Sequence, residues 1–239
     1  MVVVVKSTLH LFYTTLRARR PLIRTEMSLA LRTFARAASR DEDAREAEPQ
    51  PAHAAVAHLI NVLASILAGA AQLKEEHVNI FKYTLLPLHL PASLQSYHPQ
   101  LRACLGVFVR KLPEAGRLAS DWVLRHWPRQ STSKQVLLLD ELSEVLLMDR
   151  SAPQWLSGSA SGAALLAHVA ALMGEPHHAV VSAAMDLMEQ GHPVAAAMAT
   201  QPAGVRERLS ANLRHTIEHN WNNDVKIKAK EVLAGLPAS

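Results

Sequence analysis

Apolar residues recur along this chain at helical intervals. The clearest run places Val56, Leu59, Ile60, Leu63 and Leu67 on one stripe, at steps of three and four residues. This spacing is typical of an amphipathic helix that buries one face against a neighbour. Similar patterns along the chain predict helices over residues 7–19, 21–38, 54–71, 74–87, 97–111, 114–126, 133–148, 160–173, 177–190, 204–219 and 222–236.

The predicted helices repeat at a regular interval. Those that begin near residues 54, 97, 133 and 177 start about 40 residues apart, which with two helices per interval is the period of HEAT and armadillo repeats. No such repeat buries its own apolar face, so neighbouring repeats stack to complete one core. We therefore predict an all-α chain, a HEAT/armadillo-like α-solenoid of about five to six helix pairs, as a single domain over residues 1–239.

The stretch "SRDEDAREAEPQP" interrupts this pattern. It begins at Ser39, carries charges of both signs and contains no large apolar residue. Such a segment cannot bury enough apolar surface to offset the entropy of ordering it. We predict a charged, flexible loop over residues 39–53.

Composition favours a helical, intracellular protein. Aromatic residues make up 5% of the chain, and alternating β-branched stretches typical of strands are nearly absent. The single cysteine, Cys104, excludes an intrachain disulfide framework and fits a reducing compartment. The opening "MVVVVK" has too short an apolar run for a signal peptide. We expect a cytoplasmic and/or nuclear protein that is not exported.

One apolar segment, Val56 to Leu73, has about the length of a membrane span. His58, Asn61 and Ser65 interrupt it, and the chain has only one such segment. A buried core helix explains the pattern better, so we expect no membrane span.

The motif "HTIEH" matches the H-x-x-E-H pattern of inverted zincins. His215 and His219 lie one helical turn apart, with Glu231 on the next predicted helix as a candidate third ligand. Because the chain contains 13 histidines, pairs at this spacing arise readily by chance. We prefer the alternative interpretation, an exposed polar helix face, and expect no metal site.

Other catalytic signatures are incomplete. "GSASG", from Gly158 to Gly162, has Ala160 where a nucleophile elbow needs serine, and we predict a flexible connector there. His177 and His178 are adjacent and project in different directions from a helix, which makes them poor co-ligands. The sequence contains no Gly-rich phosphate loop and no cysteine cluster, so we expect neither a cofactor nor catalysis.

Two long phrases carry a family resemblance. They are "LINVLASILAGAAQLKEEHVNIFKYTLLPLHLPASLQSYHPQL", which begins at Leu59, and "WPRQSTSKQVLLLDELSEVLL", which begins at Trp127. Both closely resemble the B-prime regulatory subunits of protein phosphatase 2A. The resemblance extends over roughly Ser7 to Leu236, with "EPHHAVVSAAM" and "HNWNNDVKIKAKEVL" following in the expected order. It implies a HEAT-like superhelix, which the repeat period predicts independently.

The resemblance implies a targeting role without catalysis. In that family the subunit docks on the scaffold and catalytic subunits of the phosphatase and recruits substrates that carry a short LxxIxE motif, often strengthened by phosphorylation. The pocket for this motif lies on two successive repeats. Matched residue by residue, it implies seven binding residues here: His10, Tyr13, Arg20, Val62, Ile66, Lys74 and His77.

The chemistry of these positions suits such a motif. The first of them lie in "STLHLFYTTLRARRPLIR", which has four arginines and no acidic residue. His10, Tyr13 and Arg17 share one helical face, and Val62 and Ile66 share another. Cations would bind the glutamate of the motif and apolar side chains its leucine and isoleucine. The alternative interpretations are a solvated basic face and ordinary core packing.

The chain departs from the family pattern at several positions. Leu11 stands where a basic residue is expected, and Arg17 stands where an apolar residue is usual. Near the C-terminus "LMEQ", Leu187 to Gln190, replaces a tryptophan-asparagine-asparagine stretch. We expect that Leu11 removes one anion contact and that Arg17 adds a charge. The changed stretch near the C-terminus predicts altered docking on the phosphatase core.

Two other functions compete with this hypothesis. The first is a stand-alone peptide-binding α-solenoid that no longer assembles with the phosphatase core. The second is nucleic-acid binding, since basic helical faces serve as phosphate footprints. No aromatic residue interleaves with the arginines of residues 17–24 as base stacking requires, so we expect no nucleic-acid partner.

Overall fold

The computed structural model describes Thr8 and residues 11–40 and 51–236. These residues form helices joined by turns, and no strand occurs among them. The chain divides into two compact units, Met1–Leu112 (unit 1) and Pro113–Ser239 (unit 2). The single domain expected over residues 1–239 therefore stays a prediction.

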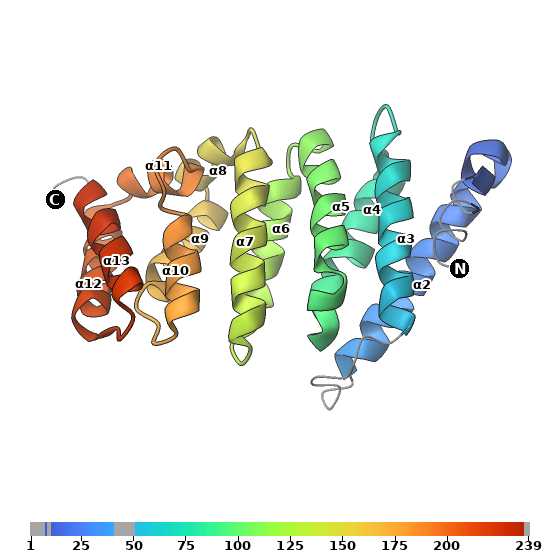
Figure 1. The fold of residues 1–239 in the computed structure, drawn as a ribbon. Coiled ribbons are helices and arrows are strands. Elements are labelled where there is room, and N and C mark those ends of the chain that lie inside the picture. The colour runs from blue at the N-terminus through green and yellow to red at the C-terminus, as the bar shows by residue number, and fades with distance from the viewer. Residues whose placement is uncertain (1–7, 9–10, 41–50, 237–239) are drawn as a thin grey trace. The chain divides into compact units, whose positions relative to one another are not determined.

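Unit 1 contains α, π and 3-10 helices. In chain order they are η1 (Arg17–Arg19), α2 (Arg20–Arg40), α3 (Pro51–Ala68), α4 (Glu75–Ile80), the π-helical turn η2 (Phe81–Leu85), η3 (Leu86–His89), η4 (Ala92–Ser96) and α5 (His98–Lys111). Helix α3 packs along α5 and contacts α2, while α2 also contacts η2 and η3 (Figure 1).

The apolar stripe of α3 forms part of the core of unit 1. Ile60, Leu63 and Leu67 are fully buried, and Val56 is nearly so. Burying a side chain of this size contributes about 1.5 to 3 kcal/mol. The stripe that the sequence indicated is therefore a packing face.

The side chain of Lys111 links the C-terminal ends of α3 and α5. Its Nζ donates hydrogen bonds to the carbonyl oxygens of Leu67, Ala68 and Ala70, at 3.0, 2.7 and 2.6 Å. The last carbonyls of a helix lack intrahelical donors and carry partial negative charge, so a cation is stabilising there.

The helix expected over residues 7–19 is interrupted. Residues 11–15 are helical, the helix ends before Leu16, and η1 follows. The side chain of Arg20 reaches back to the carbonyl oxygens of Tyr13 and Thr14, at 2.8 and 3.3 Å. These bonds satisfy carbonyls that a continuous helix would have paired with backbone N–H groups, and so they stabilise the break.

The prediction of a flexible loop over residues 39–53 is wrong at both ends, where the chain is helical. Ser39 lies in α2, and α3 begins at Pro51 and includes His53. The remaining residues of that prediction, 41–50, lie outside the described residues.

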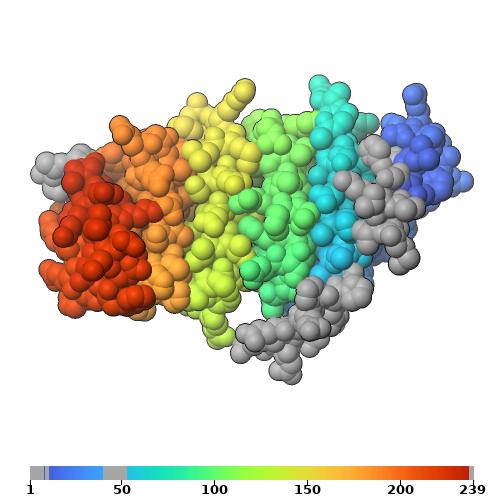
Figure 2. Space-filling model, viewed as in Figure 1, coloured from blue at the N-terminus to red at the C-terminus, as the bar shows by residue number. Residues whose placement is uncertain are grey.

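Unit 2 is built from helix pairs in two layers. Its helices are α6 (Ala115–Arg125), α7 (Thr132–Met148), α8 (Ala152–Gly158), α9 (Ala160–Leu172), α10 (His178–Asp186), α11 (Pro193–Ala199), α12 (Ala203–His219) and α13 (Asn223–Gly235). One layer consists of α7, α10 and α13, and the other of α6, α9 and α12 (Figure 1). Side chains fill most of the space between the yellow-green, orange and red helices (Figure 2).

The helices of the first layer begin at residues 132, 178 and 223, which gives intervals of 46 and 45 residues. Each pairs with a helix of the second layer, as α6 with α7, α9 with α10, and α12 with α13. The prediction of an all-α fold of repeated helix pairs is confirmed.

The expected connector "GSASG" is a tight junction between two helices. Only Ser159 separates α8 from α9, and its hydroxyl accepts a hydrogen bond from the N–H of Gly162 at 3.1 Å. Gly162 lies so close to the carbonyl oxygens of Trp155 and Leu156 that a methyl group there would overlap both. The segment is therefore held by close backbone contact.

Candidate functional site

Two arginines of α2 converge on Tyr13. The Arg20 Nε donates to the Tyr13 carbonyl oxygen at 2.8 Å, and its guanidinium carbon lies 5.1 Å from the centre of the tyrosine ring. Arg24 Nη1 donates to the Tyr13 hydroxyl at 2.6 Å. A cation over an aromatic face is attracted by the ring quadrupole, so these contacts fix Tyr13 between two positive charges.

Arg24 also joins this cluster to α4. Its Nη2 donates to Glu76 Oε1 at 2.7 Å, across 52 residues of sequence. Burial disfavours the charged guanidinium, but hydrogen bonds to Glu76 and Tyr13 outweigh it and raise the pKa of Arg24 above its ordinary value. The hydrogen bond from Arg24 likewise lowers the pKa of Glu76. Both groups therefore stay charged at neutral pH.

His77 places a hydrogen-bond donor next to Glu76. Its Nδ1 accepts the backbone N–H of Lys74 at 2.8 Å, so in the neutral ring the proton lies on Nε2, 3.8 Å from Glu76 Oε1. Burial lowers the pKa of His77, which keeps the ring neutral at physiological pH. The Nε2–H can thus donate to a carboxylate without carrying a charge.

The structure brings together four of the seven residues that the family resemblance implied. Tyr13 contacts Arg20 directly, and Lys74 contacts His77 through its backbone. Arg24 and Glu76 connect these two halves. The four residues therefore lie in one cluster of unit 1, in which the chain neighbours Glu76 and His77 link the two hydrogen-bonded halves at 3.8 Å. We call it the Tyr13 cluster, and it comprises Tyr13, Arg20, Arg24, Lys74, Glu76 and His77.

The other three residues are placed differently. His10 lies outside the described residues. Val62 and Ile66 are on α3 and are only 2% and 6% exposed, so they offer a ligand little surface. Their role in binding stays a prediction.

Sequence reasoning missed Arg24 and Glu76. Arg24 follows Arg20 by four residues and so lies on the same face of α2, which was an available signal. Glu76 precedes His77, but nothing local indicates that its carboxylate reaches a helix so distant in sequence. Only the packing of α2 against the segment after α4 brings the two charges together.

Among the described residues, no third His, Cys, Asp or Glu side chain joins the zincin-like histidines in a possible metal site. His215 and His219 lie on α12 with stacked rings 4.4 Å apart, and His219 Nδ1 lies 3.1 Å from the His215 carbonyl oxygen. Within residues 11–40 and 51–236, no group of three or more His, Cys, Asp or Glu side chains is arranged to hold a metal ion.

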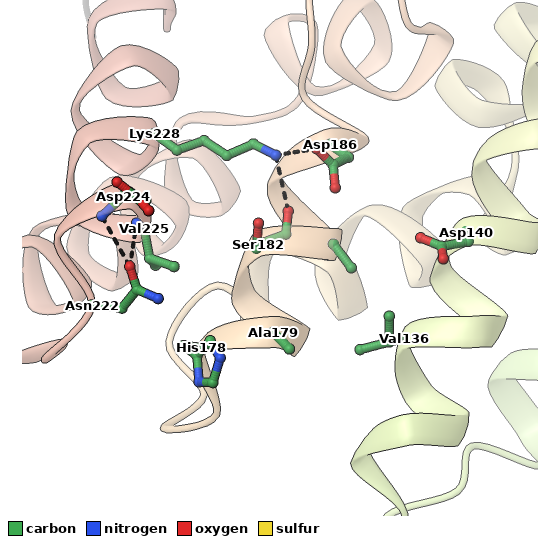
Figure 3. Close-up of a pocket in the computed structure, with 11 residues that line it drawn as sticks. Val136, Asp140, His178, Ala179, Ser182, Asp186, Asn222, Asp224, Val225 and Lys228 are labelled. Atoms are coloured by element: carbon green, nitrogen blue, oxygen red, sulfur yellow. Dashed lines mark hydrogen bonds and ion pairs between the residues drawn. The ribbon is translucent and has the colours of Figure 1, made fainter.

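Unit 2 contains a cavity of about 440 Å³ between α7, α10 and α13 (Figure 3). Lys228 forms an ion pair with Asp186 there and donates to the Ser182 carbonyl oxygen at 3.3 Å. The Asn222 Oδ1 accepts the backbone N–H of Asp224 at 2.9 Å and so caps α13. These polar groups stabilise the fold. The cavity is therefore a weaker candidate for a ligand-binding site than the Tyr13 cluster.

In the described part of the chain, no single helix is long and apolar enough to cross a membrane; α8 and α9 reach the required length and composition only as a pair bent by 86°.

Stacked helix pairs of this kind are typical of helical-repeat proteins. Comparison with known families gives the identity of this repeat protein. The family model described as protein phosphatase 2A regulatory B subunit (B56 family) matches residues 3–237. The chain belongs to the B56 family.

Individual relatives agree with this assignment. Over 221 residues the chain is 29% identical to the B' alpha isoform of the 57 kDa regulatory subunit of serine/threonine protein phosphatase 2A from Arabidopsis thaliana. It is 35% identical over 142 residues to the B' theta isoform of that plant. It is 33% identical over 141 residues to the delta 2 isoform of the 56 kDa regulatory subunit from Schizosaccharomyces pombe.

The relatives are longer than this chain. The match to the B' alpha isoform covers 92% of this chain and 41% of that protein. The matches to the theta and delta 2 isoforms each cover 59% of this chain, and 26% and 21% of those proteins. The chain therefore spans less than half the length of these relatives. All three are named as regulatory subunits, not as catalytic ones.

Proposed function

We propose that this chain is a non-catalytic targeting subunit of protein phosphatase 2A that recruits substrates through short acidic motifs of the LxxIxE type. The observation that carries the proposal is the Tyr13 cluster in a member of the B56 family, where Arg20 and Lys74 supply cations at the surface and His77, which is only 5% exposed, lies beside Lys74. The partners would be the phosphatase scaffold and catalytic subunits and LxxIxE-containing proteins, in the cytoplasm and/or nucleus.

The donors differ in strength. Arg20 uses its Nε and one terminal nitrogen to hold backbone carbonyls, which leaves the other terminal nitrogen for a ligand carboxylate. Lys74 is exposed, whereas the buried His77 is fixed by its bond to the Lys74 backbone. Each charge-assisted bond contributes about 1.5 to 3 kcal/mol when shielded and less when wet. A short peptide held by this set would bind with a micromolar dissociation constant, about 8 kcal/mol.

The departures from the family pattern change the charge around this site. Leu11 is 60% exposed, so it offers an apolar surface where a cation is usual. Arg17 is exposed at the start of η1 and adds a charge. Basic and apolar contacts are thus redistributed over the first repeat, and we expect a preference for motifs with additional acidic residues.

The test is a titration of the chain with a fluorescent LxxIxE peptide. We expect micromolar binding that Arg20→Glu weakens at least about tenfold, a loss of about 1.4 kcal/mol. Arg36→Glu makes the same charge change at an exposed position of α2 outside the Tyr13 cluster and should leave affinity unchanged. Equal affinity of the wild-type and Arg20→Glu chains would show that the peptide does not use this site.

The second candidate is a peptide-binding repeat protein that does not assemble with the phosphatase. It is favoured by "LMEQ", where the family carries tryptophan and two asparagines. Here α10 ends at Asp186, Leu187 is fully buried, and the segment turns towards α11. Co-purification at low salt with the scaffold and catalytic subunits would favour the first proposal, whereas peptide binding without either subunit would favour the second.

A further inference from the structure

A second, smaller cavity lies in unit 1, between α2 and the segment formed by α4 and η2. Its volume is about 150 Å³. Arg24, Ser28 and Arg32 line it from α2, and Asn79 and Thr84 line it from the other side. Arg24, Ser28 and Arg32 follow one another at intervals of four residues, so they form one polar ridge along α2.

Two buried donors on this ridge have no partner within the described residues. They are Arg24 Nε and Ser28 Oγ, on residues that are 9% and 5% exposed. The two terminal nitrogens of Arg24 are engaged with Tyr13 and Glu76, so Nε is the guanidinium nitrogen that has no partner among the described residues. Buried N–H and O–H groups are almost always paired, and a pair of unpaired donors beside a polar cavity indicates a missing acceptor.

The charges of the side chains that line the cavity indicate what kind of acceptor is missing. Arg24 and Arg32 each contribute a positive charge, and Glu76 is the acidic residue that lines the cavity. Arg24 already engages Glu76 Oε1. Arg32 donates its Nε to the Ser28 carbonyl oxygen at 3.3 Å, and its terminal nitrogens make no bond to another described residue. The cavity therefore keeps an excess of one positive charge.

We propose that this cavity binds a single tetrahedral oxyanion, either inorganic phosphate or the phosphoryl group of a phosphorylated side chain. Arg24 Nε, Ser28 Oγ and the terminal nitrogens of Arg32 supply donors from separate turns of α2. A tetrahedral group with several acceptor oxygens matches donors spread in this way better than a planar carboxylate does. A volume of about 150 Å³ accommodates such a group together with water.

The site differs from the Tyr13 cluster, although Arg24 and Glu76 belong to both. Ser28, Arg32 and Thr84 take no part in the contacts around Tyr13, and Arg20, Lys74 and His77 do not line the cavity. The proposal consequently does not depend on recruitment of LxxIxE motifs. It adds an anion site one and two turns further along α2.

The experiment titrates the 239-residue chain with inorganic phosphate by calorimetry, at constant ionic strength in chloride buffer. We expect saturable binding at one site, which Ser28→Ala and Arg32→Gln each weaken at least about fivefold. Arg36→Gln removes an exposed arginine of α2 that does not line the cavity, and should bind phosphate as the wild type does. Arg32→Lys, which keeps the charge and alters the donors, should give an intermediate affinity.

A second titration distinguishes the source of the oxyanion. N-acetyl-phosphoserine amide should displace inorganic phosphate if the site receives a phosphorylated protein side chain. Binding of inorganic phosphate without such displacement would assign the site to the free ion. Absence of saturable binding, or equal weakening in Arg36→Gln and Arg32→Gln, would overturn the proposal and show that water satisfies the two buried donors.

Discussion

Arg24 and Glu76 form an ion pair of 2.7 Å that joins α2 to α4. The arginine side chain is 10% exposed and the carboxylate 44%, so the pair lies at the edge of the unit 1 core. A buried cation that loses its partner retains the full cost of its desolvation. The pair therefore links the two halves of the Tyr13 cluster, since Arg24 also bonds Tyr13.

Removal of the carboxylate should destabilise unit 1. We expect Glu76→Ala to lower the free energy of unfolding by about 1 to 2 kcal/mol, because Arg24 then keeps only its bond to Tyr13. Urea denaturation followed by circular dichroism measures this. Glu75→Ala removes the exposed neighbouring acid and serves as control. Equal stability of the two variants would show that solvent screens the pair completely.

The contact at Gly162 gives a second stability prediction. A methyl group there overlaps the carbonyl oxygens of Trp155 and Leu156, so Gly162→Ala should cost about 1 to 3 kcal/mol by forcing α8 away from α9. Gly158 has open space around its Cβ position. Gly158→Ala should leave the midpoint of thermal unfolding unchanged or slightly raised, and a similar fall in both variants would contradict the assigned contact.

Stability should fall as the pH decreases below neutrality. Burial is the main cause that lowers the pKa of His77, His168 and His192 below the ordinary value of about 6.5. The unfolded chain then binds more protons than the folded chain, and stability is lost as the pH falls through the range below about 6.5. We expect a loss of up to about 1 kcal/mol per histidine near pH 5.5.

Denaturation at a series of pH values tests this dependence. His192→Asn keeps a side-chain acceptor for the Val194 N–H that caps α11 and removes one titrating group, so its stability should depend less steeply on pH. His219 is exposed, and His219→Gln should keep the wild-type slope. A wild-type stability that does not change below neutral pH would contradict the burial of these rings.

The thiol of Cys104 should be unreactive in the folded chain. The residue is fully buried, and burial raises its pKa to about 12. Since the thiolate is the reacting species, Ellman's reagent should modify Cys104 only after denaturation. Rapid modification of the native chain would show that α5 opens locally to solvent.

Periodicity predicted the long helices because each has a continuous stripe to bury. Helices α3, α7 and α12 begin and end within a few residues of their predicted bounds. The short helices α8 and α11 were not predicted, since 7 residues contain too few turns to show a stripe. Helix α10 ends at Asp186, before the predicted bound, because the chain turns there so that His192 can cap α11.

The candidate site was predictable only where the family resemblance carries it. Lys74 and His77 lie in the phrase that begins at Leu59, whereas Tyr13 and Arg20 came from the residue-by-residue match before it. The contacts place these four residues in one cluster, and their role in binding stays a prediction. Arg24 meets Glu76 across 52 residues of sequence, through a tertiary contact that no local pattern encodes. The helix expected over residues 74–87 is in fact α4, a π-helical turn and a 3-10 turn, because propensities do not distinguish these helix types.

The π-helical turn Phe81–Leu85 is closed by a hydrogen bond from the Leu86 N–H to the Phe81 carbonyl oxygen. It sets the rotation of α4 about the helix axis relative to η3. Such a turn holds an extra residue compared with an α-helix. Deleting one residue there would rotate Glu76 and His77 by about 100° relative to η3, which α2 also contacts. Arg24 would then face a different side of α4. The number of residues in this turn, more than their identity, therefore keeps the two halves of the Tyr13 cluster in register.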